Sequence, residues 1–149
     1  MNAFRQHERA DTLDAALLLM PLMLFLPADH PKVVATVAQI ESRLAINGFL
    51  YRYIEEKFPD QGNQPIGEEE GSFAMCTCWL AHYYVQRGER QRADQILRRI
   101  EAVTRNGLYS EAIDARTGTM LGNMPLLFTQ AEYAKAALAL AGAEGRGEG

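Results

Sequence analysis

Two kinds of helical segment alternate along this chain, and the alternation restricts the folds open to it. Residues 31–46 and 89–105 repeat apolar side chains on one face only. Residues 12–26, 71–86 and 129–141 are apolar nearly all round. A helix of the first kind needs solvent on one side, whereas a helix of the second kind needs neighbours on every side. The sequence therefore predicts an all-α domain of about five helices, arranged as an inner and an outer layer.

Local signals set the expected ends and faces of these helices. Asp11 is the expected N-cap of the first, and Pro31 suits the first position of the second. Asn106-Gly107 ends the fourth, because glycine relieves the left-handed cap position. The polar Gly/Glu residues 142–149 are expected to form a disordered tail. The stripes predicted to be buried are Val33, Val37, Ile40 and Leu44 in the second helix, and Ala93, Ile96, Leu97, Ile100 and Val103 in the fourth.

Composition excludes several classes of partner. A net charge of −4 and the lack of any Lys/Arg cluster argue against nucleic acid and anionic lipid. The most apolar run, residues 13–26, is shorter than the ~20 residues of a membrane span and contains Asp14 and Pro21. It is therefore predicted to be a buried helix rather than a membrane segment or a signal peptide.

The two cysteines predict a reducing environment. Cys76 and Cys78 are two residues apart in a helical segment, so they point to nearly opposite faces and cannot bridge each other. With no further cysteine, neither a disulfide framework nor a zinc site is expected. We expect two buried free thiols in a cytoplasmic protein, with no metal site and no cofactor.

The connections between helices also alternate. Residues 27–30 and 87–88 are short, whereas residues 47–70 and 106–128 are long. Successive antiparallel helices place their loops at alternate ends, so both long connections are expected at the same end of the domain. Long connections in compact domains are usually functional.

The two long connections begin alike and carry the residues of a sugar site. Asn-Gly-Phe-Leu-Tyr at residues 47–51 is echoed by Asn-Gly-Leu-Tyr at residues 106–109. Aromatic rings pack on the C–H faces of a sugar, charged groups bind its hydroxyls, and glycoside hydrolysis needs two facing carboxyl groups. The candidate residues are Tyr51, Arg52, Tyr53, Glu55, Glu56, Lys57 and Glu68 to Glu70 in the first connection, and Tyr109, Ser110, Glu111, Asp114, Arg116 and Asn123 in the second.

The second connection resembles a known active-site loop. Its segments are Gly-Leu-Tyr-Ser-Glu at 107–111, Asp-Ala-Arg-Thr-Gly at 114–118 and Leu-Gly-Asn-Met-Pro at 121–125. Together they resemble the last active-site loop of the glucoamylase/trehalase-type glycoside hydrolases, family 15. Upstream segments are similar to bacterial members in the same order, at residues 13–21, 70–73 and 76–80.

This resemblance implies both a fold and an activity. Residues 1–141 would be the C-terminal part of a catalytic domain, forming a partial (α/α)6 barrel. The reaction would be inverting hydrolysis of an α-glucoside or oligosaccharide, which releases glucose and needs no cofactor. Glu111 lines up with the catalytic base that activates water, and Arg52 with an arginine that holds the substrate's hydroxyls. Tyr51 beside Arg52, and Glu70 next to the matched Gly71, are the further candidate substrate-binding residues.

The chain also departs from the family pattern. The family's general acid lies in a Trp-Glu segment before the matched region, whereas the single tryptophan here, Trp79, falls in the third helix. Five helices cannot close a ring of twelve, and Gln130 stands where bacterial members typically have His. We therefore expect a homologue that lacks half of its active site and is inactive alone. Its apolar first helix would be exposed at the open edge, which favours self-association or an N-terminal partner segment.

Two alternatives remain open. In one, this chain and a second chain build an intact enzyme, with Glu111 as base and the other chain supplying the acid. In the other, the chain is a non-catalytic helical-hairpin interaction module, similar to tetratricopeptide scaffolds. The ~34-residue period of such repeats is not seen. A lone loop glutamate such as Glu111 is also, most often, simply solvated.

Overall fold

The computed structural model describes residues 3–8, 11–53, 71–104 and 106–144. The helices are a short 3-10 helix η1 (Ala15–Leu18), α1 (Leu19–Leu22), α2 (Pro31–Leu44), α3 (Ala74–Gln86), α4 (Arg90–Val103) and α5 (Leu127–Glu144). Two-residue strands occupy the long connections: β1 (Ala45–Ile46), β2 (Phe49–Leu50), β3 (Ser72–Phe73), β4 (Ala112–Ile113) and β5 (Met120–Leu121). The expected helical domain is confirmed, with small sheets added at the connections.

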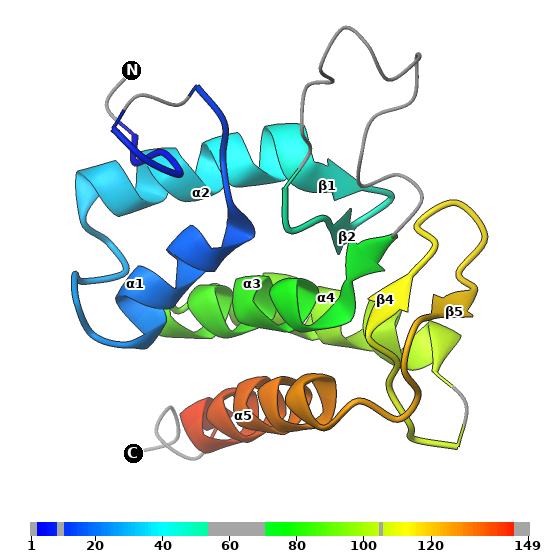
Figure 1. Cartoon of the computed structure of the whole chain (residues 1–149). Coiled ribbons are helices and arrows are strands. Elements are labelled where there is room, and N and C mark those ends of the chain that lie inside the picture. The colour runs from blue at the N-terminus through cyan, green and yellow to red at the C-terminus, as the bar shows by residue number, and fades with distance from the viewer. Residues whose placement is uncertain (1–2, 9–10, 54–70, 105, 145–149) are drawn as a thin grey trace, which may run out of the picture.

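Helix α3 lies at the centre of the molecule. It packs mainly on α4 and α5 and also touches η1 and α1. In Figure 1, α2 lies above α3 and α5 lies below it, while α4 passes behind α3. The α3 residues are apolar on all sides and almost all buried, including Trp79 and Tyr83. This is the position that the sequence predicts for an all-round apolar helix.

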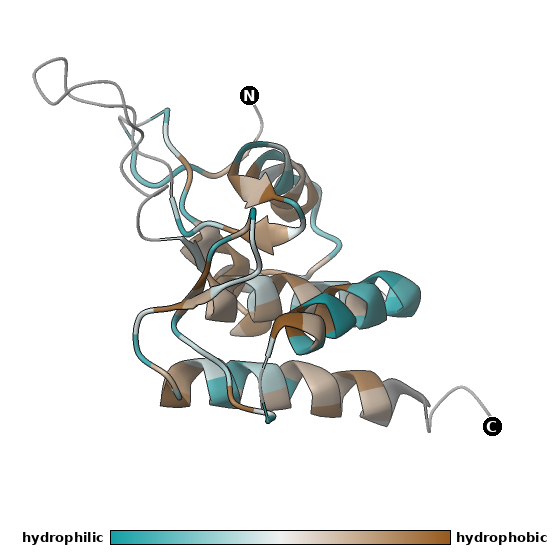
Figure 2. Cartoon of the chain, turned by 90° about the vertical axis from the view of Figure 1, so that its right-hand side faces the viewer, coloured by the Kyte–Doolittle hydropathy of each residue, from teal (hydrophilic) through white to brown (hydrophobic). Residues whose placement is uncertain are grey.

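The outer helices α2 and α4 are amphipathic, as expected. The stripe predicted for α2 is buried in full. In α4, Ala93, Ile96, Leu97 and Ile100 are buried, whereas Val103 at the last turn is only half-buried. Figure 2 shows hydrophilic residues gathered along α4. Solvent therefore lies on the outside of this layer.

The first helical segment differs from the prediction. In place of one helix over residues 12–26, the chain forms only η1 and α1, which together end at Leu22. Asp14, not Asp11, is the N-cap, because its carboxylate accepts a hydrogen bond from the backbone N–H of Ala16. Leu24 adopts a positive φ of 60° just after α1, a conformation that does not continue a helix.

Burial along this segment also differs from the expectation. Leu13, Ala15, Leu18 and Pro21 are buried, so the first apolar segment is covered rather than open. The next turn, Met23 to Phe25, is exposed instead. The prediction of an exposed first helix was wrong for the segment's core positions.

The strands account for the other shifted helix ends. Helix α2 stops at Leu44 because β1 and β2 pair as an antiparallel hairpin across Asn47-Gly48. Helix α3 starts at Ala74, because Ser72 and Phe73 pair with Ile113 and Ala112.

Helix α5 runs from Leu127 to Glu144, past the expected end at residue 141, and residues 145–149 lie outside the described part of the chain. No helix in that described part is both long and apolar enough to cross a bilayer.

Glu41 on α2 ties the outer layer to the centre. Its Oε2 accepts a hydrogen bond from the Tyr84 hydroxyl of α3 at 2.5 Å, and its Oε1 accepts one from Arg92 of α4 at 2.8 Å. The Arg92 guanidinium also lies over the Tyr84 ring, 4.1 Å from its centroid. One carboxylate thus links three helices.

A buried hydroxyl joins the first long connection to α3, and it yields a stability prediction. The backbone N–H of Leu50 donates to Thr77 Oγ1 at 2.9 Å, and neither residue is exposed. In Thr77→Val the shape is kept but the acceptor is lost, so an amide is left buried without a partner. We expect a loss of about 1–3 kcal/mol in the free energy of unfolding by urea denaturation. Amide hydrogen exchange of Leu50 should speed up in this variant and stay slow in Thr77→Ser, and equal protection in the two would contradict the assignment.

Candidate functional site

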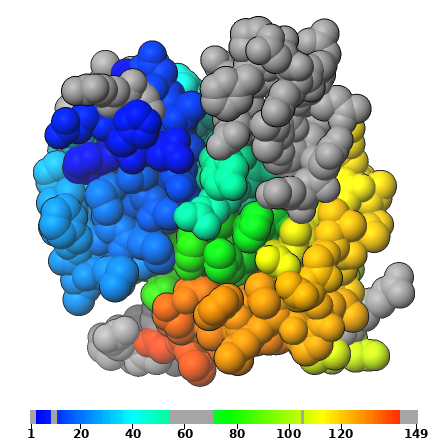
Figure 3. Space-filling view, in the orientation of Figure 1, coloured from blue at the N-terminus to red at the C-terminus, as the bar shows by residue number. Residues whose placement is uncertain are grey.

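The structure brings the two long connections together at one end of the helices, as expected. Strand β3, which follows the first connection, pairs with β4 of the second, and β4 pairs with β5. The side-chain amide of Asn47 donates to the backbone carbonyl of Ala115 at 3.0 Å. Figure 1 shows the strands gathered at the right-hand end of the molecule. In Figure 3, residues of the second connection adjoin α3 and α5 on one face.

The repeated Asn-Gly pairs adopt the same backbone conformation. Asn47 and Gly48 have φ values of 50° and 82°, and Asn106 and Gly107 have φ values of 55° and 70°. Asparagine and glycine are the residues that adopt this left-handed region most readily. The two similar sequence segments therefore form the same kind of turn, and each turn begins one of the long connections.

Glu111 is fixed through its backbone from two sides. Its carbonyl accepts a hydrogen bond from the N–H of Ala74, the first residue of α3, at 3.0 Å. Its own N–H donates to the carbonyl of Asn123 at 2.9 Å. The neighbouring Ser110 is buried, and its hydroxyl donates to the Ala112 carbonyl at 2.6 Å. Glu111 thus follows a fixed turn and directly precedes β4.

The carboxylate of Glu111 is also held. Its Oε2 accepts hydrogen bonds from the side-chain amide of Asn123 at 2.8 Å and from the backbone N–H of Asn123 at 3.2 Å. The side chain is only half-buried. Two N–H donors on one oxygen keep the carboxylate in a fixed direction.

Gly122 leaves the space that this carboxylate occupies. A Cβ on residue 122 would lie 2.8 Å from Glu111 Oε2 and 3.1 Å from Glu111 Cβ. Gly122 also has a positive φ of 70°. Both its lack of a side chain and its backbone conformation therefore fit glycine.

The Asp114 turn after β4 is built by a second carboxylate. Asp114 accepts hydrogen bonds from the Arg116 N–H and the Thr117 hydroxyl, each at 2.8 Å. These bonds, that from Arg116 first, lower the pKa of Asp114. Asp114 therefore stabilises the hairpin between β4 and β5.

Tyr51 and Arg52 follow β2 directly. Tyr51 is buried, and its N–H donates to the Leu44 carbonyl at 2.9 Å. The Arg52 side chain is half-exposed, and its Nε lies 3.5 Å from Asp14 Oδ1. The structure therefore anchors Arg52 on Asp14 and Glu111 on Asn123, each on its own partner.

The Asp14–Arg52 pair lies close to the buried thiol of Cys76. Burial is the main cause that raises the pKa of Cys76, the Asp14 charge raises it further, and the Arg52 charge lowers it. Burial likewise raises the pKa of Cys78. Both thiols are free and buried, as expected, and the thiolate form is disfavoured in each.

Not every candidate residue can be placed in the structure, and two residues that contact Arg52 and Glu111 were not selected from the sequence. Glu70, together with the other glutamates of residues 55–70, falls outside the described residues. Asp14 and Gly122 were not selected as site residues. Asp14 was detectable as a charged residue directly before an apolar helical run. Gly122, in contrast, is explained by its positive φ together with the proximity of Glu111, and the sequence does not reveal that proximity.

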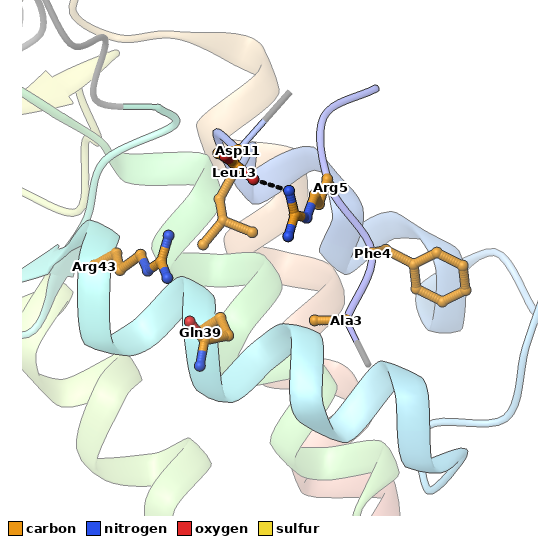
Figure 4. A pocket seen from close by; sticks show the side chains of 7 residues that line it. All are labelled: Ala3, Phe4, Arg5, Asp11, Leu13, Gln39 and Arg43. Carbon is orange, nitrogen blue, oxygen red and sulfur yellow. Dashed lines mark ion pairs between the residues drawn. The ribbon is translucent and has the colours of Figure 1, made fainter. Parts of the chain in front are cut away.

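A separate cavity of about 310 Å³ lies where the N-terminal segment crosses α2. Figure 4 shows Arg5 and Asp11 from that segment, paired with each other, and Gln39 and Arg43 from α2. None of the predicted site residues lines this cavity. Among the described residues, no group of three or more His, Cys, Asp or Glu side chains is arranged to hold a metal.

Comparison with known proteins identifies a family. The sequence model described as glycosyl hydrolases family 15 matches residues 1–92, more than half of the chain. A trehalase of Mycolicibacterium smegmatis is 42% identical over 120 residues, which cover 80% of this chain and 17% of that protein. A trehalase of Thermoplasma volcanium is 35% identical over 125 residues, which cover 83% of this chain and 19% of that protein. The chain thus spans about one-fifth of the length of these curated relatives, and Glu111 lies beyond the residues matched by the family model.

Solved structures show the fold. A bacterial glucoamylase complexed with acarbose matches with a TM-score of 0.70 and 21% identity, over 90% of this chain and 21% of that chain. A glycosidase matches with a TM-score of 0.71 and 19% identity, over 94% of this chain and 39% of that chain. The helical layers described above are therefore part of an (α/α)6 barrel, as predicted.

The close approach of Gly122 to Glu111 can be tested against a matched glycine. Gly107 has the same φ as Gly122, 70°, but a Cβ there would meet nothing within 4 Å. Both Gly107→Ala and Gly122→Ala should lose about 1–2 kcal/mol of stability through the positive φ. Gly122→Ala should lose a further ~1–2 kcal/mol in urea unfolding, because the carboxylate is pushed off its two N–H donors. The NMR signals of the Asn123 side-chain amide should move in Gly122→Ala only, and equal effects in the two variants would contradict the contact.

Proposed function

Because this chain belongs to glycosyl hydrolases family 15, we propose that residues 1–141 form the C-terminal part of the catalytic domain of an inverting α-glucoside hydrolase. The substrate is an α-glucoside or oligosaccharide, of the kind cleaved by trehalase- or glucoamylase-type enzymes. Glu111 is the general base. The matched relatives named trehalase and the matched glucoamylase support this class of substrate.

One observation carries the proposal: the carboxylate of Glu111 is held by two N–H donors on one oxygen and faces a glycine. A base for hydrolysis must stay ionised and keep its direction while it takes a proton from water. The two N–H donors of Asn123 and the open space at Gly122 keep the Glu111 carboxylate in one direction. A solvated loop glutamate without a role would not need either.

Glu111 acts by accepting a proton from a water molecule as that water attacks the anomeric carbon. In inverting hydrolysis a carboxylic acid about 6.5–9.5 Å away protonates the leaving oxygen from the opposite side. Arg52 donates hydrogen bonds to the sugar hydroxyls, and Tyr51 and Glu70 complete the sugar contacts. We assign the acid to a segment outside these 149 residues, so the chain alone carries the base half of the site.

Without the acid, turnover should be lost while sugar binding remains. We expect the 149-residue chain to release glucose from trehalose or maltooligosaccharides no faster than Glu111→Gln, because a missing general acid costs about 10²–10⁴-fold in rate. Glucose should still shift the NMR signals of the Asn123 side-chain amide, and Glu111→Gln should weaken that effect. Both are read by NMR, one as product release and the other as a titration.

The matched control is Glu132→Gln, the same change on α5, which should leave both readouts unaltered. Release of β-glucose that Glu111→Gln abolishes would show that a complete site assembles and would overturn the half-site proposal. A titration that is insensitive to Glu111→Gln would overturn the assignment of the base. Peptide binding without any sugar binding would favour the helical-hairpin interaction module instead.

The same proposal places the protein in the cytoplasm. Cys76 and Cys78 are unpaired, and burial keeps both as thiols. Proteins of reducing compartments keep their cysteines in this form.

We further propose that the chain alone self-associates through α5. Leu127 and Leu138 are 76% and 73% exposed, and the next residue to Leu127, Phe128, is 67% exposed. Ala131 and Ala134 are exposed between the two leucines. These positions follow the spacing of one helix face, and Thr129 and Ala136 on the other side are buried.

An apolar helix face of this kind is covered in a stable assembly. In isolation a second copy of the chain is the available cover, whereas an N-terminal partner segment would compete for the same face. Figure 2 shows hydrophobic residues along α5, in contrast to the hydrophilic α4. We therefore place the proposed interface at α5, where the exposed leucines share one helix face.

Leu138→Glu should shift the chain toward monomer in sedimentation or light scattering at moderate concentration, because a charge in a buried apolar interface is costly. Leu24→Glu is the matched control, since Leu24 is 85% exposed and lies outside α5. It should leave the association constant unchanged. A monomeric parent chain, or an equal effect of the two variants, would overturn the α5 interface.

A further inference from the structure

We propose that Asp14 is a positioning residue for Arg52: it presets the guanidinium in the orientation that binds the sugar. The proposal rests on the proposed function of Arg52 as a substrate-binding residue. It concerns an acidic side chain that lies in a different segment of the sequence, at the start of η1.

Asp14 is itself firmly placed. Its Oδ1 accepts a hydrogen bond from the N–H of Ala16 at 2.8 Å, which caps η1. Its side chain is only 15% exposed. The next residue, Ala15, is fully buried. A carboxylate that is fixed by its own helix and mostly out of water is a rigid reference point for a neighbouring charge.

Arg52 is tied to this point through both its backbone and its side chain. Its carbonyl accepts a hydrogen bond from the N–H of Ala15 at 2.7 Å. Its Nε lies 3.5 Å from Asp14 Oδ1, a distance that gives an ion pair rather than a short hydrogen bond. The Nε atom is buried without a hydrogen-bond partner, while 43% of the side chain remains exposed. The root of the guanidinium is therefore held, and part of the side chain is reachable from solvent.

The geometry indicates that Asp14 orients the Arg52 side chain rather than stabilising the fold. A partly exposed ion pair at this distance contributes little to folding. A free arginine side chain has many rotamers, and ordering it on binding weakens affinity. The charge of Asp14 selects one of these orientations before any ligand arrives. The Tyr53 ring, 5.9 Å from the guanidinium carbon, borders the same side chain.

Asp14→Asn separates the two roles of this residue. The asparagine oxygen still caps Ala16, because Asn is as good an N-cap as Asp, so stability should be kept. The attraction for Arg52 is lost. We expect the heteronuclear NOE of the Arg52 Nε–H group to fall in 15N NMR. Glucose affinity, measured by NMR titration, should fall about three- to tenfold, the range expected for ordering one long side chain.

The matched control is Asp94→Asn, which removes the same charge from the exposed Asp94–Arg98 pair on α4. It should change neither readout. An unchanged Arg52 signal in Asp14→Asn would overturn the proposal, whether or not the chain binds sugar. Loss of Arg52 order with unchanged glucose affinity would overturn the link to binding. Loss of Arg52 order in a chain whose parent binds no sugar would support the positioning by Asp14 and contradict only the proposed function.

Discussion

The pairing of β3 with β4 is the constraint on which the functional end of this molecule depends. It pairs Ser72, just after the first long connection, with Ile113 in the second. The Ser72 hydroxyl also donates a hydrogen bond to the Ile113 carbonyl at 2.7 Å. The pairing brings the start of α3 to Glu111, whose carbonyl accepts the Ala74 N–H. Gly71 allows this approach, because a Cβ there would lie 2.9 Å from the Ile113 oxygen. The loop residue Glu111 is thus tied through its backbone to the first residue of the buried helix α3.

The layered fold was predictable wherever periodicity and burial agree. The buried stripe of α2, and that of α4 except for Val103, were predicted correctly, because the polar face of an amphipathic helix is visible in the sequence. The segment before α2 was not, because apolar residues at 13–26 look the same whether they lie in a helix or in a turn. The positive φ of Leu24 and the cap at Asp14 decide that outcome locally. The extent of α5 was underestimated because its end was expected before Gly142, whereas the helix continues through this glycine to Glu144.

Glu111 and Arg52 were selected as candidates because they stand in motifs that resemble a family. The sequence did not show which residues hold them, although Asn123 was itself among the candidates. Their partners, Asn123 and Asp14, contact them through atoms that are distant in sequence or depend on a cap. Gly122 lies within a matched motif, but its contact with the Glu111 side chain, eleven residues away, is visible only in the structure. Supporting residues of this kind act through distances, which a single sequence does not contain.

Helices α3 and α5 differ in how fully the described fold buries their apolar side chains. Helix α3 is covered by α1, α4 and α5, so its burial does not need a closed ring. Helix α5 buries one side on α3 and leaves Leu127 and Leu138 exposed on the other. Covering these leucines requires a partner that is not part of the described fold. The site residues follow the same division. Glu111 and Arg52 are anchored by contacts within the chain and therefore keep their geometry, while the chemistry proposed for them needs an acid from elsewhere. In the proposed function, this part of a barrel therefore keeps one half of the site in place, and turnover requires the other half.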